Sequence, residues 1–258
     1  MWGLCVASSC LREPERETVD VLFSLDARAA GAAAPPELRE LGARLFDKAG
    51  CATCHERSAF GADGGVHGYA TPSLMDVGRQ LVFGWDGRVG ELAAYVRREL
   101  AQRAGLADDA AVRALDDAAL TLDDAAAAIA AHLSTWRSRG RWDRYVEGDD
   151  DALTAEERDG LAAFVDSGCA TCHAGRNLGG RSVHVLGLAE PLPGREPHEF
   201  RAPMLRHAAR TAPYLHDHSI ARLDDAVRLM ARHELGRTLA DGDVRAIVTF
   251  LHATTDTD

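Results

Sequence analysis

The hexapeptide GCATCH occurs twice in this chain, at residues 50–55 and again at residues 168–173. Each copy holds two cysteines separated by two residues and followed at once by a histidine. The first cysteines of the two copies are 118 residues apart, counted from Cys51 to Cys169 in a chain of 258 residues. The repeat therefore predicts two centres of the same chemistry, and a chain that divides into two similar parts.

Three kinds of site use a Cys-x-x-Cys pair. A zinc ribbon needs its two pairs about 15 to 20 residues apart, which this spacing excludes. A thioredoxin-like dithiol needs a βαβ unit and has no use for the histidine. Cys-x-x-Cys-His is the attachment signature of c-type haem, in which two thiols bind the porphyrin and the imidazole ligates the iron. We expect two covalent haems, held by Cys51, Cys54 and His55 and by Cys169, Cys172 and His173.

Composition and charge indicate the general type of protein and the partners it could bind. A hydrophobic share of 46% with 27% charged residues is ordinary for a soluble globular protein, and no apolar run reaches the roughly 18 residues of a membrane span. The net charge of −11 disfavours nucleic acid as a partner, because such binders rely on cationic groups. An acidic surface would instead steer a basic partner.

The N-terminal segment MWGLCVASSC is short, apolar and free of Lys and Arg. Its Ala-Ser-Ser-Cys resembles the end of a lipoprotein signal, which makes Cys10 the candidate for a lipid anchor. The alternative is an incomplete or misassigned N-terminus. Because c-type haem is attached outside the bacterial cytoplasmic membrane, the motifs themselves imply an exported, periplasmic protein.

The approach to each motif has the same pattern. An Ala/Gly/Pro-rich stretch at residues 27–36 predicts a linker, after which residues 36–49 have helical periodicity that ends at Gly50. Before the second motif, Thr154 and Glu157 form a capping box and Gly168 ends the helix. The matching positions are Gly42 with Gly160, Phe46 with Phe164 and Gly50 with Gly168.

This duplication predicts a leader or linker at residues 1–36, a first haem domain at 37–147 and a second at 148–258. Further helices are expected from Thr121 to about Trp136, over residues 223–231 and over residues 241–251. No segment alternates with period two. The predicted fold is mainly α.

From about residue 37 to 254 the chain resembles the bacterial diheme cytochrome c peroxidase family. The resemblance is strongest in RWDRYVEGDDDALTAEERDGLAAFVDSGCATCH and in FRAPMLRHAARTAPYLHDHSIARLDDAVRLMARHELGRTLADGDVRAIVTFL, and weaker in HGYATPSLMDVGRQLVFGWDGR. It implies two cytochrome c-like haem domains whose haems face a shared interface. It also implies reduction of hydrogen peroxide by a small electron donor, a cytochrome c or a cupredoxin, and a homodimer.

For the second haem the resemblance implies an electron-transfer centre with Met230 as the distal ligand, and a thioether raises the reduction potential. Spacing alone leaves this open, because Leu223, Val227 and Met230 also form a core stripe. Met204 and His207 are the alternative ligands.

For the first haem the resemblance implies a peroxidatic centre whose distal ligand is His67, in a His-Gly pair. Met75 is the alternative, and would make this haem a second electron carrier. Trp85, in WDGR, matches the tryptophan that lies between the two haems in the family. It could equally be an aromatic residue that fills the interface.

Two departures from the family pattern concern function. Tyr95 stands where the family places an active-site Gln, and the Glu that assists proton transfer has no counterpart, although Glu91 or Glu99 could substitute. The alternative function is therefore a non-enzymatic diheme electron carrier on the same fold. Residues 211–213 match a calcium-binding segment, but Ala70 replaces the Asn that completes that site, so one oxygen ligand is missing.

Overall fold

The computed structural model describes residues 16–24, 34–55, 69–116, 119–194 and 198–255. Cys10 and His67, both singled out in the sequence, lie outside these residues. The described α-helices are α1 (Arg16–Phe23), α2 (Pro36–Lys48), α3 (Leu92–Gln102), α4 (Asp109–Leu115), α5 (Leu122–Leu133), α6 (Arg141–Val146), α7 (Ala155–Asp166), α8 (Leu223–Leu235) and α9 (Asp241–Ala253).

The mainly helical class is confirmed, and the predicted helix starts hold in detail. The capping box of Thr154 and Glu157 opens α7, and a second capping box of Thr121 and Asp124 opens α5. Helix α5 ends at Leu133, earlier than predicted, because Ser134 caps it and its hydroxyl donates to the Ala130 carbonyl. One element that the sequence did not predict is an antiparallel pair, β1 (Val183–Val185) and β2 (Glu199–Arg201). Three residues are too few for an alternating pattern to be recognised.

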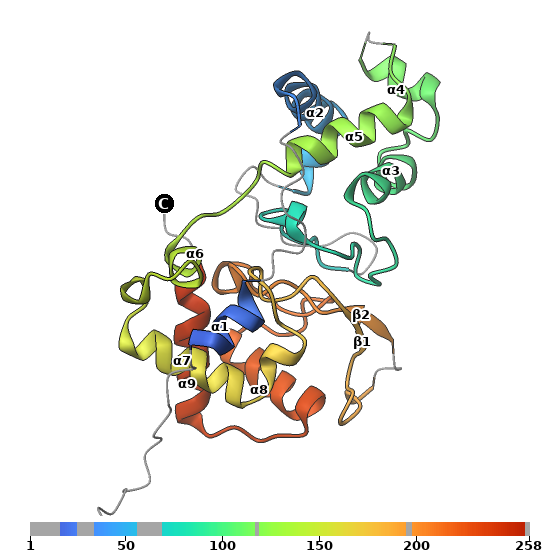
Figure 1. Cartoon of the computed structure of the whole chain (residues 1–258). Coiled ribbons are helices and arrows are strands. Elements are labelled where there is room, and N and C mark those ends of the chain that lie inside the picture. Colours follow the sequence, from blue (N-terminus) through green and yellow to red (C-terminus); the bar gives the residue numbers. More distant parts are fainter. Residues whose placement is uncertain (1–15, 25–33, 56–68, 117–118, 195–197, 256–258) are drawn as a thin grey trace, which may run out of the picture.

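The helices pack around two separate hydrophobic cores, and Figure 1 shows the corresponding two lobes. The first core is formed mainly by α2, α3, α4 and α5. The second contains residues of α1, α6, α7 and α9. Helix α6 thus packs with the second core, although it precedes the boundary that the sequence predicts at residue 147.

The glycines matched between the two motifs have the same structural role. A Cβ added to Gly42 on α2 would lie 1.9 Å from the Ala128 carbonyl oxygen on α5, and one added to Gly160 on α7 would lie 2.1 Å from that of Ala246 on α9. Both distances are far below any real contact. Each glycine therefore lets two helices cross in backbone contact, and the crossing is repeated in the two lobes.

Helix α1 is a difference from the sequence prediction, which begins the ordered chain near Glu37. The side chains of Val19 and Phe23 are fully buried in the second core, and the Phe23 ring meets Trp142 edge-on at 5.3 Å. The Leu22 carbonyl also accepts a hydrogen bond from the Gly175 amide at 2.7 Å. Figure 1 shows α1 on the lower lobe, far in sequence from the helices it covers. A pattern of two buried apolar residues is too short to predict helix α1 from the sequence, because the helix depends on its contacts with the second core.

After each motif the backbone repeats itself with an offset of 131 residues, so that Pro72 corresponds to Pro203. A 3₁₀ turn follows in both copies, η2 (Val77–Arg79) and η5 (Ala208–Arg210), each preceded by a residue with positive φ. Isolated bridges then close equivalent loops, Phe83 to Val89 in the first copy and Tyr214 to Ile220 in the second. Helices α3 and α8 begin at equivalent residues. We call this correspondence the internal repeat.

A buried charge cluster joins the two lobes; we define it as Asp76, Arg79, Ser138, Asp143, Arg206 and His207. The Arg206 guanidinium is fully buried, donates to both Asp143 carboxylate oxygens, and lies with its Nε 3.4 Å from Asp76 Oδ2. Arg79 Nη1 lies 3.2 Å from Asp76 Oδ1. Asp76 belongs to the first copy of the internal repeat and Arg206 to the second. The cluster thus ties the lobes by charge-assisted bonds that exclude water.

The pKa values of both carboxyls in this cluster lie below their usual range. Burial alone would raise the pKa of Asp143, but the Arg206 hydrogen bonds and charge outweigh it. For Asp76, hydrogen bonds from His207 and Ser138 and the Arg206 charge outweigh burial in the same way. Both carboxyls are therefore ionised at neutral pH, as a buried cation requires.

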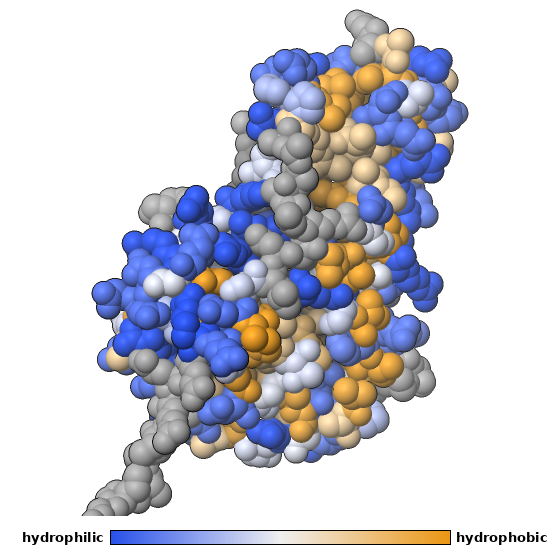
Figure 2. All heavy atoms as spheres, in the orientation of Figure 1, coloured by the Kyte–Doolittle hydropathy of each residue, from blue (hydrophilic) through white to orange (hydrophobic). Residues whose placement is uncertain are grey.

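The surface is mixed. Figure 2 shows hydrophilic residues over most of the visible face, with hydrophobic ones between them. Among the described residues, none of the helices is both long and apolar enough to span a membrane.

Candidate haem sites

The two GCATCH motifs adopt the same local structure. Gly50 and Gly168 both have positive φ, at 74° and 93°, which ends the preceding helix in the left-handed conformation that glycine tolerates best. A 3₁₀ turn follows, η1 (Cys51–Thr53) and η4 (Cys169–Thr171). In both copies the histidine amide donates to the carbonyl of the first cysteine at 3.0 Å. The two identical hexapeptides thus adopt the same backbone conformation.

The orientation of each motif histidine is fixed by a carbonyl of the internal repeat. His55 Nδ1 lies 3.1 Å from the Pro72 oxygen, and His173 Nδ1 lies 3.1 Å from that of Pro203. A carbonyl can only accept, so Nδ1 carries the hydrogen in both rings and Nε2 is left as the metal-binding nitrogen. Burial lowers the pKa of both histidines, that of His173 to about 4. Neutral imidazoles with a free Nε2 fit an iron ligand.

The motif cysteines fit covalent attachment. All four are unpaired and half-buried. Burial raises the pKa of Cys51 and of Cys169 to about 11, so the thiols are neutral in this apolar setting. Among the described residues, no group of three or more His, Cys, Asp or Glu could hold a metal ion on its own. The motifs therefore suit a porphyrin-borne iron better than a bare ion.

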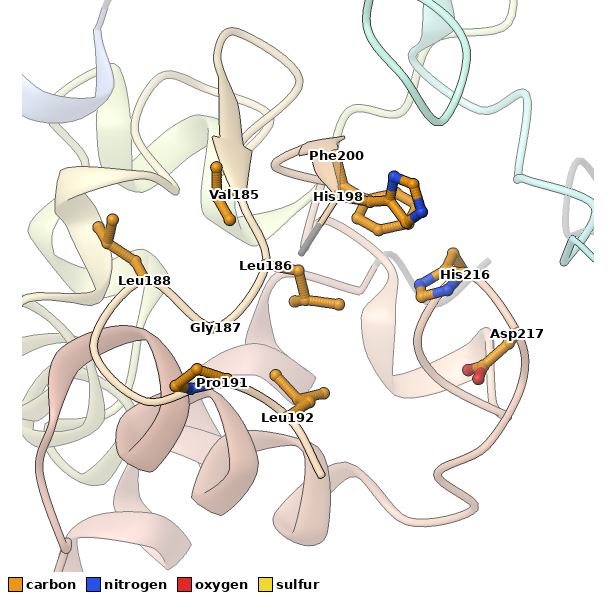
Figure 3. Close-up of a pocket in the computed structure, with 10 residues that line it drawn as sticks. All are labelled: Val185, Leu186, Gly187, Leu188, Pro191, Leu192, His198, Phe200, His216 and Asp217. Carbon is orange, nitrogen blue, oxygen red and sulfur yellow. The ribbon is translucent and has the colours of Figure 1, made fainter. Parts of the chain in front are cut away.

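A cavity of about 470 Å³ lies beyond β1 in the second lobe. Figure 3 shows Leu186, Leu192 and Phe200 directed into it, with His216 at its far side. Its outer segment is fastened to α8, because the Gly187 amide donates to the Glu234 carboxylate at 2.6 Å. The lining is mostly apolar and includes neither Met230 nor any of the six motif residues.

The structure places the three candidate distal ligands of the second haem in different surroundings. Met204 follows Pro203, whose carbonyl contacts Nδ1 of His173, and its sulfur accepts a hydrogen bond from the Asn177 amide at 2.9 Å. His207 belongs to the buried charge cluster, 3.5 Å from Asp76. Met230 is half-buried at the middle of α8. Met204 and His207 are thus both engaged with other groups, and Met230 as the distal ligand stays a prediction.

Two aromatic residues at equivalent positions of the internal repeat, Trp85 and His216, meet between the lobes. Their rings are 6.3 Å apart and nearly perpendicular. Both are bonded to the backbone of Ala70: the indole nitrogen of Trp85 donates to its carbonyl at 2.9 Å, and its amide donates to the His216 carbonyl. His216 in turn stacks on Phe200 at 4.1 Å. Sequence analysis missed His216, although PYLHDHSI repeats the spacing of VFGWDGRV.

Tyr95 lies on α3, beside the loop that holds Phe83 and Gly84. Its ring stacks on Phe83 at 6.1 Å, and the Arg98 guanidinium lies 4.7 Å above the ring. Burial raises the Tyr95 pKa, so the hydroxyl is neutral and available as a donor. The nearby Arg201 is buried, donates to the Gly84 carbonyl at 3.0 Å, and has its pKa lowered to about 10 by burial. No described carboxylate forms an ion pair with Arg201, and a haem propionate would fit as its counter-ion.

Comparison with known proteins decides the family. The chain is 33% identical to cytochrome c551 peroxidase of Pseudomonas aeruginosa over 83% of this chain and 78% of that protein. The chain belongs to the bacterial diheme cytochrome c peroxidase family. It is also 28% identical to cytochrome c551 peroxidase of Nitrosomonas europaea, over 85% of this chain and 80% of that protein. No protein-family model matches.

A solved structure agrees on the fold. The diheme peroxidase BthA of Burkholderia thailandensis superposes with a TM-score of 0.67 at 19% identity, covering 90% of this chain and 89% of that one. The prediction of a peroxidase-like oxidoreductase is confirmed, and membership of a diheme peroxidase family implies two haem c groups.

The calcium site that the resemblance implied does not fit this family member. Ala70 offers no side-chain oxygen, and its backbone carbonyl already accepts from Trp85. The Thr211 hydroxyl donates to the Ala208 carbonyl at 3.3 Å. A hard cation needs six or more oxygen ligands, and this set is too small. We assign calcium no part in the function.

Proposed function

We propose that this protein reduces hydrogen peroxide to water at the haem of the first motif, with electrons that enter at the haem of the second motif. The observation that carries the proposal is the matched orientation of His55 and His173, each held by a proline carbonyl with Nε2 left as the metal-binding nitrogen. Two such sites in a peroxidase family member call for two haems. Each bound haem would supply an iron that exchanges electrons and, at the first site, binds peroxide.

Six residues would hold the two haems. Cys51 and Cys54 attach the first and His55 ligates its iron, within a domain at residues 37–147. Cys169, Cys172 and His173 do the same for the second, within residues 148–258. The two separate hydrophobic cores support this division, with α1 and α6 added to the second core.

The second haem is proposed as the point of electron entry because of Met230. A thioether ligand favours the reduced state of the iron and so raises its potential. A small donor, a cytochrome c or a cupredoxin, would reduce this haem first. The contact between Trp85 and His216 then lies on the direct path between the lobes. Aromatic rings in contact there would shorten the gap that an electron must cross between the haems.

At the first haem, His67 is proposed as the distal ligand that leaves when the second haem is reduced. The departure of His67 would leave room for peroxide to bind there. Tyr95, with its neutral hydroxyl on α3, would donate a hydrogen bond at the site.

The haem motifs also lead us to propose export to the periplasm, where the protein would form a homodimer and bind no nucleic acid. A lipid anchor at Cys10 belongs to the same proposal. Mass spectrometry of the mature N-terminus tests the anchor directly. An unmodified Met1 would contradict it.

One observation favours a second function, a diheme electron carrier without enzymatic activity. Tyr95 stands at the position of the family's Gln, and the family's Glu has no counterpart. A single assay separates the two functions. Protein with the second haem reduced and the first oxidised is mixed with one equivalent of hydrogen peroxide and the reduced donor. Stoichiometric donor oxidation supports the peroxidase, and an unchanged donor supports the carrier.

A further inference from the structure

The internal repeat pairs Glu99 with Met230. Glu99 is the eighth residue of α3 (Leu92–Gln102), and Met230 is the eighth residue of α8 (Leu223–Leu235). The two helices begin at equivalent points after equivalent loops, closed by the bridges at Phe83 and Tyr214. If α8 presents Met230 to the second haem, α3 presents Glu99 to the first haem from the same direction.

The electrostatics of the first motif agree with that placement. Burial dominates the pKa shift of Cys51, and the Glu99 charge raises that pKa further. The same charge acts on His55, where it opposes the lowering of the pKa by burial. Glu99 is therefore close to both the attachment cysteine and the proximal histidine, although 44 residues separate it from His55 in sequence.

The carboxylate is also held in place. Its side chain is 26% exposed, and Arg103 Nε lies 2.5 Å from one of its oxygens. The Glu99 charge also raises the pKa of Tyr95, second to burial, which places the carboxylate near this phenol one turn earlier on α3. Glu91, the other carboxylate that the sequence offered, is exposed at the N-terminal end of α3 and does not share this environment. Of these two carboxylates, only Glu99 lies at the helix position that corresponds to Met230.

We propose that Glu99 is the proton-transfer residue for peroxide cleavage at the first haem, with Tyr95 as its hydrogen-bond partner. This inference rests on the proposed peroxidase function. Glu99 accepts the proton of the peroxide oxygen nearer the iron and returns it to the outer oxygen. The O–O bond then breaks and the outer oxygen leaves as water with both hydrogens. The donor supplies two electrons through the haems, and the inner oxygen takes two solvent protons to form the second water.

The first test uses hydrogen cyanide as a probe, because it is a neutral acid that must lose its proton to bind ferric iron. Glu99→Gln keeps the shape of the side chain and removes the base. Cyanide association with the half-reduced protein should slow by about 10²-fold or more, the usual contribution of a positioned base. Azide, which binds as an anion, should associate at the wild-type rate. The matched control is Glu91→Gln on the same helix, with both rates unchanged.

The second test reads the position of residue 99 without any reaction. In Glu99→Met the internal repeat predicts a thioether opposite His55, as at the second haem. In half-reduced Glu99→Met, where His67 has left the first haem and the second haem is ferrous, the near-infrared absorption of a ferric His/Met haem should appear, and the half-reduced wild type should lack it. An unchanged spectrum would place residue 99 away from the iron and overturn the inference.

These results separate the inference from the function it rests on. If the wild type consumes peroxide while Glu99→Gln binds cyanide at the wild-type rate, Glu99 is not the base and the peroxidase function stands. If the wild type neither consumes peroxide nor binds cyanide, the peroxidase function fails, and the role of Glu99 fails with it.

Discussion

The first and second halves of this molecule share a backbone and differ at the positions that face their haem sites. Both have the same motif turn, the same histidine-to-proline contact and the same helix after the closing loop. Where the second half has Met230, the first has Glu99; where the second has Ala226, the first has Tyr95. One scaffold thus holds two similar motifs, and we propose that a few side chains on one helix face determine whether the site stores an electron or reacts.

The largest effect should come from removing the attachment cysteines of one half at a time. Replacing Cys51 and Cys54 by Ala should remove one covalent haem, and replacing Cys169 and Cys172 should remove the other. Each double variant should carry one haem per chain by pyridine haemochrome assay and intact mass. Two haems retained in either variant would contradict the attachment sites.

The buried charge cluster that joins the two halves can be tested at Arg206. Arg206→Met removes the fully buried cation between Asp76 and Asp143 and leaves Arg79 as the cation that still contacts both carboxylates. Breaking a buried ion pair from one side costs about 3–5 kcal/mol. We expect the free energy of unfolding, measured by urea titration of the holoprotein, to fall by that amount.

A matched control for Arg206 lies on the surface. Arg228 pairs with Asp241 at 2.8 Å, and both side chains are well exposed. Arg228→Met should cost less than about 1 kcal/mol, because solvent screens an exposed pair. Equal costs for the two variants would mean that the buried charge cluster does not hold the halves together.

The second half should lose its electron-storing character when Met230 is replaced. Met230→His should lower the potential of the second haem by on the order of 0.1 V, because the thioether is what raises it. Met204→Leu is the control and should leave the potential unchanged. Spectroelectrochemical titration measures both, and a shift in Met204→Leu alone would reassign the ligand.

The smallest effect should be seen where the halves meet. Trp85→Leu removes the aromatic contact with His216 and the hydrogen bond to Ala70. Electron transfer between the haems should slow by about tenfold, equal to a barrier change of about 1.4 kcal/mol. Flash-induced reduction followed at each haem measures this rate. If Trp85→Leu transfers at the wild-type rate, the tryptophan only fills the interface.

Local signals in the sequence were enough for several elements. Thr121 and Thr154 correctly predicted the starts of two helices, because a capping box involves only residues close together in the sequence. Gly50 and Gly168 marked the helix ends for the same reason. The two cysteine motifs and their histidines could be recognised in the sequence, because covalent attachment of haem requires this spacing. These features depend on contacts within about four residues.

What the sequence could not supply depends on contacts between distant residues. Helix α1 is stabilised by Trp142, and Asp143 is paired with Arg206. In both cases the two partners are far apart in the sequence, so no local pattern predicts the contact. The choice between Glu91 and Glu99 stayed open because both follow WDGR closely, one at the N-cap of α3 and the other within it. Only the internal repeat, visible in the backbone as paired turns and bridges, gave Glu99 a counterpart in Met230.

The most direct measurement is an electron paramagnetic resonance spectrum of the half-reduced protein, before and after one equivalent of hydrogen peroxide. The account predicts that reducing the second haem converts the first from a low-spin His/His form to a high-spin or exchangeable form, and that peroxide consumes this form. A first haem that stays low-spin and ignores peroxide would contradict the account and leave a two-haem electron carrier.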